Sequence, residues 1–185
     1  MKIVLVGDSI RKGYQPLVEK KVGDQAEVWG PAENCRHSLV HRESLTAWAV
    51  ETRPSVYHFN CGIHDLIKLD SAPRFTVSGY VRNLKLIVRR LRAETRARLI
   101  WATTTPMLVP LDDMTPKQDC RLDPEVERYN AAALRVMQGA GIEVNDLYGV
   151  VIEAGVYECL SDDKCHMSPY GNEVLSDAVV RCVLG

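Results

Sequence analysis

The sequence has no long hydrophobic run and almost no net charge. No stretch approaches the roughly 18 consecutive apolar residues that cross a membrane, so we expect no membrane association. The formal charge is −1 over 185 residues, which gives no basic surface for nucleic acid or anionic lipid. The N-terminus has no separate apolar segment with a small-residue cleavage site. We therefore expect a cytoplasmic protein.

Two further patterns are missing. The six cysteines form no C-x-x-C pair, and no His/Cys spacing fits a zinc site. We therefore expect reduced thiols, no metal and no cofactor. The first apolar run is not followed by G-x-G-x-x-G, because only Gly7 and Gly13 are present there. Nucleotide binding is thus only weakly supported.

What is present is an ordinary globular composition, with 46% hydrophobic and 25% charged residues. The length favours a single domain, residues 1–185. Strand-like apolar runs alternate with helical patterns, which predicts an α/β protein with a five-stranded parallel sheet and helices on both faces. We expect strands at residues 2–6, 26–29, 55–60, 98–103 and 142–144, and helices at 15–22, 43–50, 76–94, 124–138 and from 169.

Polar residues gather where the predicted strands end. The segments concerned read G-D-S at 7–9, E-N-C-R-H-S at 33–38 and G-I-H-D at 62–65, and D-K-C-H at 163–166 precedes the last helix. Open α/β sheets bind ligands at the carboxyl ends of their strands. We therefore expect the functional site at this edge of the sheet.

Three of these residues fit nucleophilic catalysis. Asp163 and His166 are three apart in a turn before a helix, so the carboxylate can reach the Nδ1–H of the imidazole. The other ring nitrogen is then free to act as a base. A serine hydroxyl needs such a base, and Ser9 follows the first strand, which is central in a doubly wound sheet. A catalytic triad of these three residues is the hypothesis.

Three sequence blocks resemble the SGNH/GDSL family of esterases and lipases. V-G-D-S-I at residues 6–10 looks like the opening block, G-I-H-D at 62–65 resembles the third block G-x-N-D, and D-K-C-H at 163–166 resembles the closing block. The resemblance spans nearly the whole chain. It implies a flavodoxin-like three-layer α/β/α fold, with Ser9 as nucleophile, His166 as base and Asp163 as orienting acid.

The same resemblance implies supporting residues and an oxyanion hole. Asp8 and Asp65 would brace the loops. The oxyanion would be held by the Ser9 N–H, a backbone N–H of the second block and the side chain of the third-block Asn, which is His64 here. An imidazole N–H can donate to an oxyanion, but substrate orientation or simple packing are alternative roles for His64.

The second block has no clear glycine, because Gly30 ends the second predicted strand. The 33–38 loop is the expected oxyanion loop, with Asn34 donating through its amide and Arg36 through its backbone N–H. Asn60 ranks below Asn34 as a donor. The sequence does not choose between these groups.

We therefore predict a serine esterase that forms an acyl-enzyme and acts on a small-molecule ester. The chain is short and lacks a long apolar loop, so a small acyl group, such as acetyl on a carbohydrate, is the working hypothesis. The alternatives are a catalytically weak or non-enzymatic binding module on the same fold, and an O-acyltransferase. The oligomeric state is not predicted.

Several other residues have plainer interpretations. We expect His37 and His41 at the surface and His58 in the core. Cys165 lies between Asp163 and His166 but lacks a base of its own, so it is not the preferred nucleophile. The loop at 109–122 is long enough to be a lid or a binding loop.

Overall fold

The computed structural model describes residues 1–69, 72–109, 117 and 120–185. Its centre is a parallel sheet in the order β2-β1-β3-β6-β9. Counted along this sheet alone, the order is 2-1-3-4-5, which confirms the predicted flavodoxin-like topology. The strands are β1 (Lys2–Val6), β2 (Glu27–Trp29), β3 (Val56–Phe59), β6 (Arg98–Ala102) and β9 (Glu143–Asn145).

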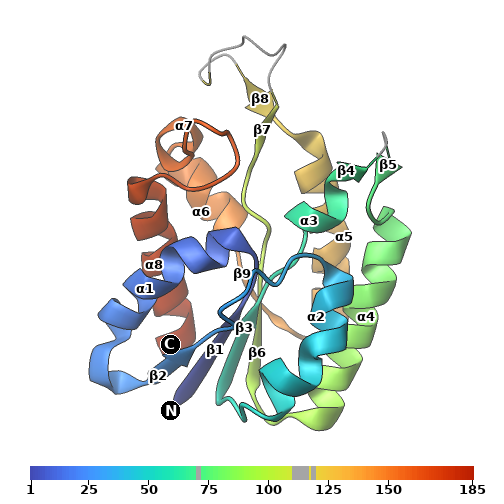
Figure 1. Ribbon diagram of the computed structural model, residues 1–185, viewed down its shortest axis with the longest axis vertical. Helices are drawn as coiled ribbons and strands as arrows, with labels where there is room; N and C mark the ends of the chain where they lie inside the picture. Colours follow the sequence, from blue (N-terminus) through green and yellow to red (C-terminus); the bar gives the residue numbers. More distant parts are fainter. Residues whose placement is uncertain (70–71, 110–116, 118–119) are drawn as a thin grey trace.

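Helices cover both faces of this sheet (Figure 1). One face carries α1 (Ser9–Val22), α6 (Leu147–Ala154), α7 (Val156–Cys159) and α8 (Pro169–Leu184). The other face carries α2 (Ser38–Leu45), α4 (Val77–Glu94) and α5 (Pro124–Gly139). The expected three-layer arrangement is therefore present.

Strand β1 contributes to both cores. Ile3 and Leu5 pack with the α1–α8 layer, whereas Val4 and Val6 pack with the α2–α4–α5 layer. All four side chains are at most 1% exposed. Successive side chains of a strand point to opposite faces, so a continuous apolar run is what a strand covered on both sides requires.

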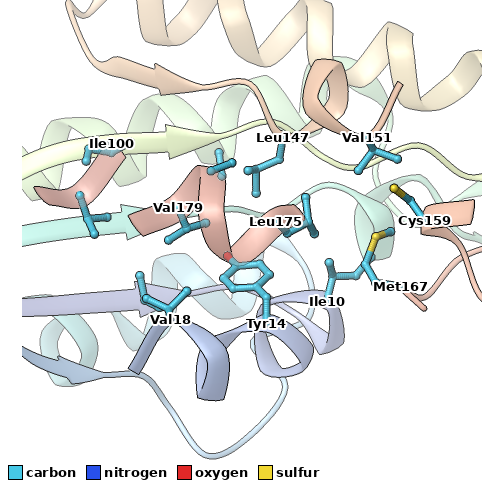
Figure 2. Packing of buried hydrophobic residues seen from close by; sticks show 14 of the residues in the cluster. Ile10, Tyr14, Val18, Ile100, Leu147, Val151, Cys159, Met167, Leu175 and Val179 are labelled. Carbon is cyan, nitrogen blue, oxygen red and sulfur yellow. The ribbon is translucent and has the colours of Figure 1, made fainter. Parts of the chain in front are cut away.

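The α1–α8 pair forms much of the first layer. Figure 2 shows Tyr14 and Val18 of α1 pointing towards Leu175 and Val179 of α8. A side chain at Gly13 would meet Asn172 of α8. The absence of a side chain at Gly13 allows α1, which begins within the first sequence block, and α8, which follows the last one, to pack closely together.

Two helices start earlier than predicted. Helix α1 begins at Ser9 rather than at residue 15, because Asp8 caps its first turn and Pro16 is tolerated inside it. Helix α2 begins at Ser38 rather than at residue 43, and a π-helical turn, Thr46–Val50 (η2), follows it. Residues that look irregular in the sequence thus lie in helices at the functional edge of the sheet.

Several short elements were not predicted. Helices α6 and α7 follow β9, and α3 (Ile63–Leu66) follows β3. Two small antiparallel pairs lie beyond the sheet edge: β4 (Lys68–Leu69) with β5 (Ala72–Pro73), and β7 (Leu108–Val109) with β8 (Arg121–Leu122). Most of the 109–122 loop, interpreted from the sequence as a lid or a binding loop, lies outside the described residues, namely 110–116 and 118–119.

Among the described residues, no helix combines the length and the apolar character that a bilayer crossing requires.

Candidate active site

Ser9 lies where strand β1 gives way to helix α1. It is the first residue of α1, where backbone N–H groups have no acceptor within the helix. Strand β1 pairs with β2 on one side and β3 on the other, so Ser9 lies at the switch point where open α/β sheets bind ligands. Ser9 therefore lies at the carboxyl edge of the sheet, where the sequence analysis expects the functional site.

Asp8 caps the helix that Ser9 begins. Its Oδ1 accepts a hydrogen bond from the N–H of Ile10 at 3.0 Å, and its side chain is buried. Burial raises the pKa of Asp8, although the hydrogen bond from the Ile10 N–H and the charge of Arg11 oppose this effect. These contacts fit the bracing role that the family resemblance implied for Asp8.

Ser9, His166 and Asp163 form a continuous hydrogen-bonded chain. The Oγ of Ser9 lies 2.8 Å from the Nε2 of His166. The Nδ1 of the same imidazole lies 2.6 Å from the Oδ2 of Asp163. The side chains of Asp163 and His166 are each about half exposed, so a substrate can reach the imidazole from solvent.

The loop between α7 and α8 fixes the Asp163 carboxylate. Its Oδ1 accepts hydrogen bonds from the N–H of Cys165, the N–H of His166 and the hydroxyl of Ser161. Partial burial raises the pKa of Asp163, but these hydrogen bonds and the one from the His166 ring outweigh it. The pKa is held well below its usual range, so the carboxylate stays ionised beside the imidazole.

Cys165 is not prepared for nucleophilic attack. Burial raises the pKa of its thiol to about 12, with smaller contributions from Asp163 and Asp8. A thiolate is the reactive form, and it is scarce at neutral pH under these conditions. The preference for Ser9 over Cys165 is consistent with this environment.

The comparisons with known proteins identify the family. Residues 5–174 match the sequence profile described as the GDSL-like lipase/acylhydrolase family. The chain belongs to this family. The human protein named isoamyl acetate-hydrolyzing esterase 1 homolog is 30% identical over 122 residues, which cover 62% of this chain and 49% of the human protein. The GDSL chain described here thus spans about half the length of that relative.

Solved structures share the whole fold of this GDSL chain. The acetyl xylan esterase AlAXEase superposes with a TM-score of 0.77 at 16% identity, over 99% of this chain and 100% of that one. The lipase/acylhydrolase from Enterococcus faecalis has the same TM-score at 23% identity, over 98% and 94% of the two chains.

The third GDSL block places His64 at the start of a short helix. Gly62 precedes α3, and a Cβ there would collide with the Oγ1 of Thr104, so a larger residue would displace Thr104 or the start of α3. Burial lowers the pKa of His64, the Asp8 carboxylate opposes this, and Arg74, Arg36 and His166 lower it further. His64 is therefore a neutral imidazole at pH 7, with one ring N–H to donate.

Asp65 ties the third block to helix α2. Its carboxylate accepts hydrogen bonds from both the N–H and the hydroxyl of Ser38, and the Ser38 hydroxyl also accepts one from Asn83. Burial raises the pKa of Asp65 to about 6, despite the two Ser38 hydrogen bonds. The contacts match the bracing role that the family resemblance implied.

The second block differs from the expectation in one respect. The N–H of Arg36 donates to the Oδ1 of Asn34 at 2.8 Å, so this N–H closes a turn inside the loop instead of serving as an open oxyanion donor. Arg36 has φ of +52°, a left-handed conformation that favours glycine. The hydrogen bond from the Arg36 N–H uses only the amide oxygen of Asn34. The Nδ2 group of Asn34 can therefore still act as a donor. Asn60 donates to the carbonyl of Ala102, so its amide is engaged in the sheet.

The burial of the histidines away from Ser9 differs in part from the prediction. His58 is fully buried beside Asn145, as expected. The surface prediction for His41 is wrong: its ring is fully buried among aromatic side chains and lies 3.0 Å from the hydroxyl of Tyr57. His41 is on the α2 face that packs on the sheet. His37 is partly buried, and its ring packs against Phe75.

One residue near the site had no sequence signal. Arg11 is two positions after Ser9 and resembles any polar residue of a helix, yet it is only 4% exposed. Its guanidinium donates to the backbone carbonyl of Glu33, the first residue of the 33–38 loop, and to that of Pro31 just before it. Within the described part of the chain, no group of His, Cys, Asp and Glu side chains is arranged to hold a metal ion.

Proposed function

We propose that the protein is a carboxylic ester hydrolase that uses Ser9, His166 and Asp163 as its catalytic triad. The observation that supports this most directly is the unbroken chain from the Ser9 Oγ through the His166 ring to the Asp163 carboxylate. In the first step, His166 Nε2 removes the hydroxyl proton while Ser9 attacks the ester carbonyl. Asp163 accepts the Nδ1–H and stabilises the imidazolium that forms.

The remaining steps reuse the same groups. His166 gives its proton to the leaving alcohol oxygen as the tetrahedral intermediate collapses to an acyl-Ser9. A water then enters, His166 takes one of its protons, and the second intermediate releases the carboxylic acid and restores the Ser9 hydroxyl. These reaction steps need no cofactor.

Three donors are proposed for the oxyanion. The Ser9 N–H is in the first turn of α1, where the helix dipole also favours negative charge. His64 offers a ring N–H because its imidazole is neutral, and Asn34 offers its Nδ2 because its Oδ1 already accepts from Arg36. In other enzymes, loss of one such donor costs about 100- to 1000-fold in kcat.

We propose acetyl as the acyl group. The human relative is named for isoamyl acetate, and the matched xylan esterase is named for acetyl groups on a polysaccharide. Both names share the acyl part and differ in the alcohol part. A small acyl group with an undetermined alcohol, such as a carbohydrate, agrees with the expectation from the sequence.

A p-nitrophenyl ester series from acetate to decanoate, with Ser9→Ala as the control, tests the proposal. We expect kcat/KM to be highest for acetate, and Ser9→Ala to lose all but background turnover. Full turnover by Ser9→Ala would rule out the triad, and a maximum at octanoate or longer would rule out the acetyl assignment. Product analysis with an added alcohol acceptor separates hydrolysis from acyl transfer.

A further inference from the structure

Arg11 connects the nucleophile turn to the second block. It lies in the first turn of α1, two residues after Ser9, and is 4% exposed. Its Nη2 donates to the carbonyl of Pro31 at 2.8 Å and to that of Glu33 at 3.0 Å. The same nitrogen lies 3.4 Å from the carbonyl of Gly7. One guanidinium therefore reaches both loops at once.

The acceptors of Arg11 are unusual for a buried cation. Buried charges are normally paired with an opposite charge. Within the described part of the chain, the hydrogen-bond acceptors of the Arg11 guanidinium are three backbone carbonyls, the Cys35 sulfur and the Oε1 of Gln15. The positive charge is thus used to bind main chain, where charged donors make stronger hydrogen bonds than neutral ones.

Two glycines leave space for the Arg11 side chain. A Cβ on Gly7 would lie 2.7 Å from the Cβ of Arg11, whereas a Cβ on Gly30 would first meet the Gln15 side chain and the Leu5 carbonyl, with the Arg11 Nη1 next at 3.1 Å. Gly7 precedes Asp8 in the nucleophile turn, and Gly30 follows strand β2. The backbone at Gly7 therefore approaches the arginine more closely than a residue with a side chain would allow, and Gly30 leaves room for Arg11 together with its partner Gln15.

The carbonyls that Arg11 holds lead directly to a proposed oxyanion donor. Glu33 immediately precedes Asn34, and residues 30–37 form no helix or strand between β2 and α2. Besides Arg11, the N–H of Cys35 holds this loop by donating to the Gly7 carbonyl at 3.2 Å. A loop without secondary structure is fixed by such contacts, and Arg11 supplies most of them.

We infer that Arg11 is a positioning residue that fixes the Asn34 amide relative to the Ser9 hydroxyl in the oxyanion hole. This inference rests on the proposed function. Lysine cannot replace the arginine, because its ammonium ends one bond short of the Nη2 position that contacts the Gly7, Pro31 and Glu33 carbonyls. Lysine also lacks the second terminal nitrogen that bonds Gln15. Arg11 acts through the loop and is distant from the proton transfers.

The inference predicts a specific kinetic pattern. An oxyanion donor acts in the transition state, so its displacement lowers kcat and leaves KM almost unchanged. For Arg11→Lys and Arg11→Met we expect kcat to fall about 10- to 100-fold, a smaller loss than for removal of a donor. The inhibition constant of a boronic acid, whose Ser9 adduct carries an oxyanion-like oxygen, should rise by a similar factor.

The test measures kcat, KM and boronic acid inhibition for both variants with p-nitrophenyl acetate. Arg98→Met is the matched control, because Arg98 also donates to a backbone carbonyl, that of Cys182, at the opposite end of strand β6. The Arg98→Met variant should keep the wild-type kcat. Addition of millimolar guanidinium to Arg11→Ala should restore part of the lost kcat, which a general loss of stability would not allow.

The outcomes separate the inference from the function on which it rests. An inactive wild-type protein would overturn the proposed function. An active wild type together with a wild-type kcat for Arg11→Lys would overturn the inference alone. Should Arg11→Met fail to fold, Arg11→Lys, which keeps the charge and most of the side-chain packing, carries the test.

Discussion

The Nε2 of His166 lies 2.8 Å from the Oγ of Ser9, although 157 positions separate the two residues in the chain. The contact depends on the packing of α1 against α8, since these helices follow the two loops concerned. Ser9 is the first residue of α1, and His166 lies three residues before α8. Changes that separate these helices should therefore weaken the contact.

Asp163→Asn should lower kcat by about 100- to 10,000-fold. The amide can present its NH2 group to the His166 ring and favour the wrong tautomer, as in serine proteases. Ser161→Ala is the matched control, because it removes only one hydrogen bond to the same carboxylate, and we expect a loss of less than about tenfold. Steady-state kinetics on p-nitrophenyl acetate measures both. Equal losses in the two variants would contradict the orienting role of Asp163.

Substitutions of His64 test its role as an oxyanion donor. His64→Ala should lower kcat by about 100- to 1000-fold with little change in KM. His64→Asn should recover much of that loss, because an amide N–H replaces the ring N–H. His37→Ala provides the control, since this neighbouring ring packs on Phe75. If His64→Ala changes KM alone, His64 contacts the substrate and is not an oxyanion donor.

The Gly62→Ala variant should be destabilised and nearly inactive. The added Cβ would collide with the Oγ1 of Thr104, so either the Thr104 side chain or helix α3, which carries His64, would have to shift. Gly139→Ala is the control, because nothing lies within 4 Å of a Cβ there. We expect its Tm to stay the same or rise. Thermal melts and kcat test this pair, and a wild-type kcat in Gly62→Ala would count against the strict need for glycine.

Two buried histidines should make the fold sensitive to acid. Burial lowers the pKa of His41 to about 3 and that of His58 to about 4, whereas both titrate near 6.5 when unfolded. Below pH 6.5 the unfolded chain therefore binds more protons, and stability falls with falling pH. At pH 5 each histidine accounts for a loss of about 2 kcal/mol relative to pH 8.

Urea unfolding at pH 8 and pH 5 measures this loss. His58→Gln should show a smaller pH-dependent loss than wild type, whatever its absolute stability. Asp65 acts in the opposite direction: its folded pKa is raised to about 6, so its contribution to stability decreases as pH rises from about 4 to 6. An unchanged pH-dependent loss in His58→Gln would show that its ring is protonated in the folded state.

The sheet was predictable because its signals are local. The apolar runs at β1, β3 and β6 are short, end in polar turns and are buried. Helix α5 was equally clear, since Val126, Tyr129 and Met137 recur at helical spacing and are all buried. Helix α6 was missed because its segment, L-Y-G-V-V-I-E-A, is apolar and rich in β-branched residues. Periodicity does not separate helix from strand there.

Site residues were predictable from the sequence only where they belong to a recognisable motif. Ser9, Asp163 and His166 stand in blocks that resemble a family, and the structure brings them together. Arg11 gave no signal, because its acceptors lie 20 and 22 positions along the chain. His41 was misplaced since its buried face, shared with Ser38 and Leu45, contains two polar residues. Such assignments require the tertiary structure.

The most direct test of the account is covalent labelling of Ser9. The protein is incubated with an organophosphonate ester inhibitor, and the product is examined by intact mass and by peptide mapping. We predict one adduct per chain on Ser9, loss of esterase activity in step with labelling, slow labelling of His166→Ala, and none of Ser9→Ala. Esterase activity that persists after full labelling, or an adduct at Cys165 with Ser9 unmodified, would contradict the assignment of Ser9 as the nucleophile.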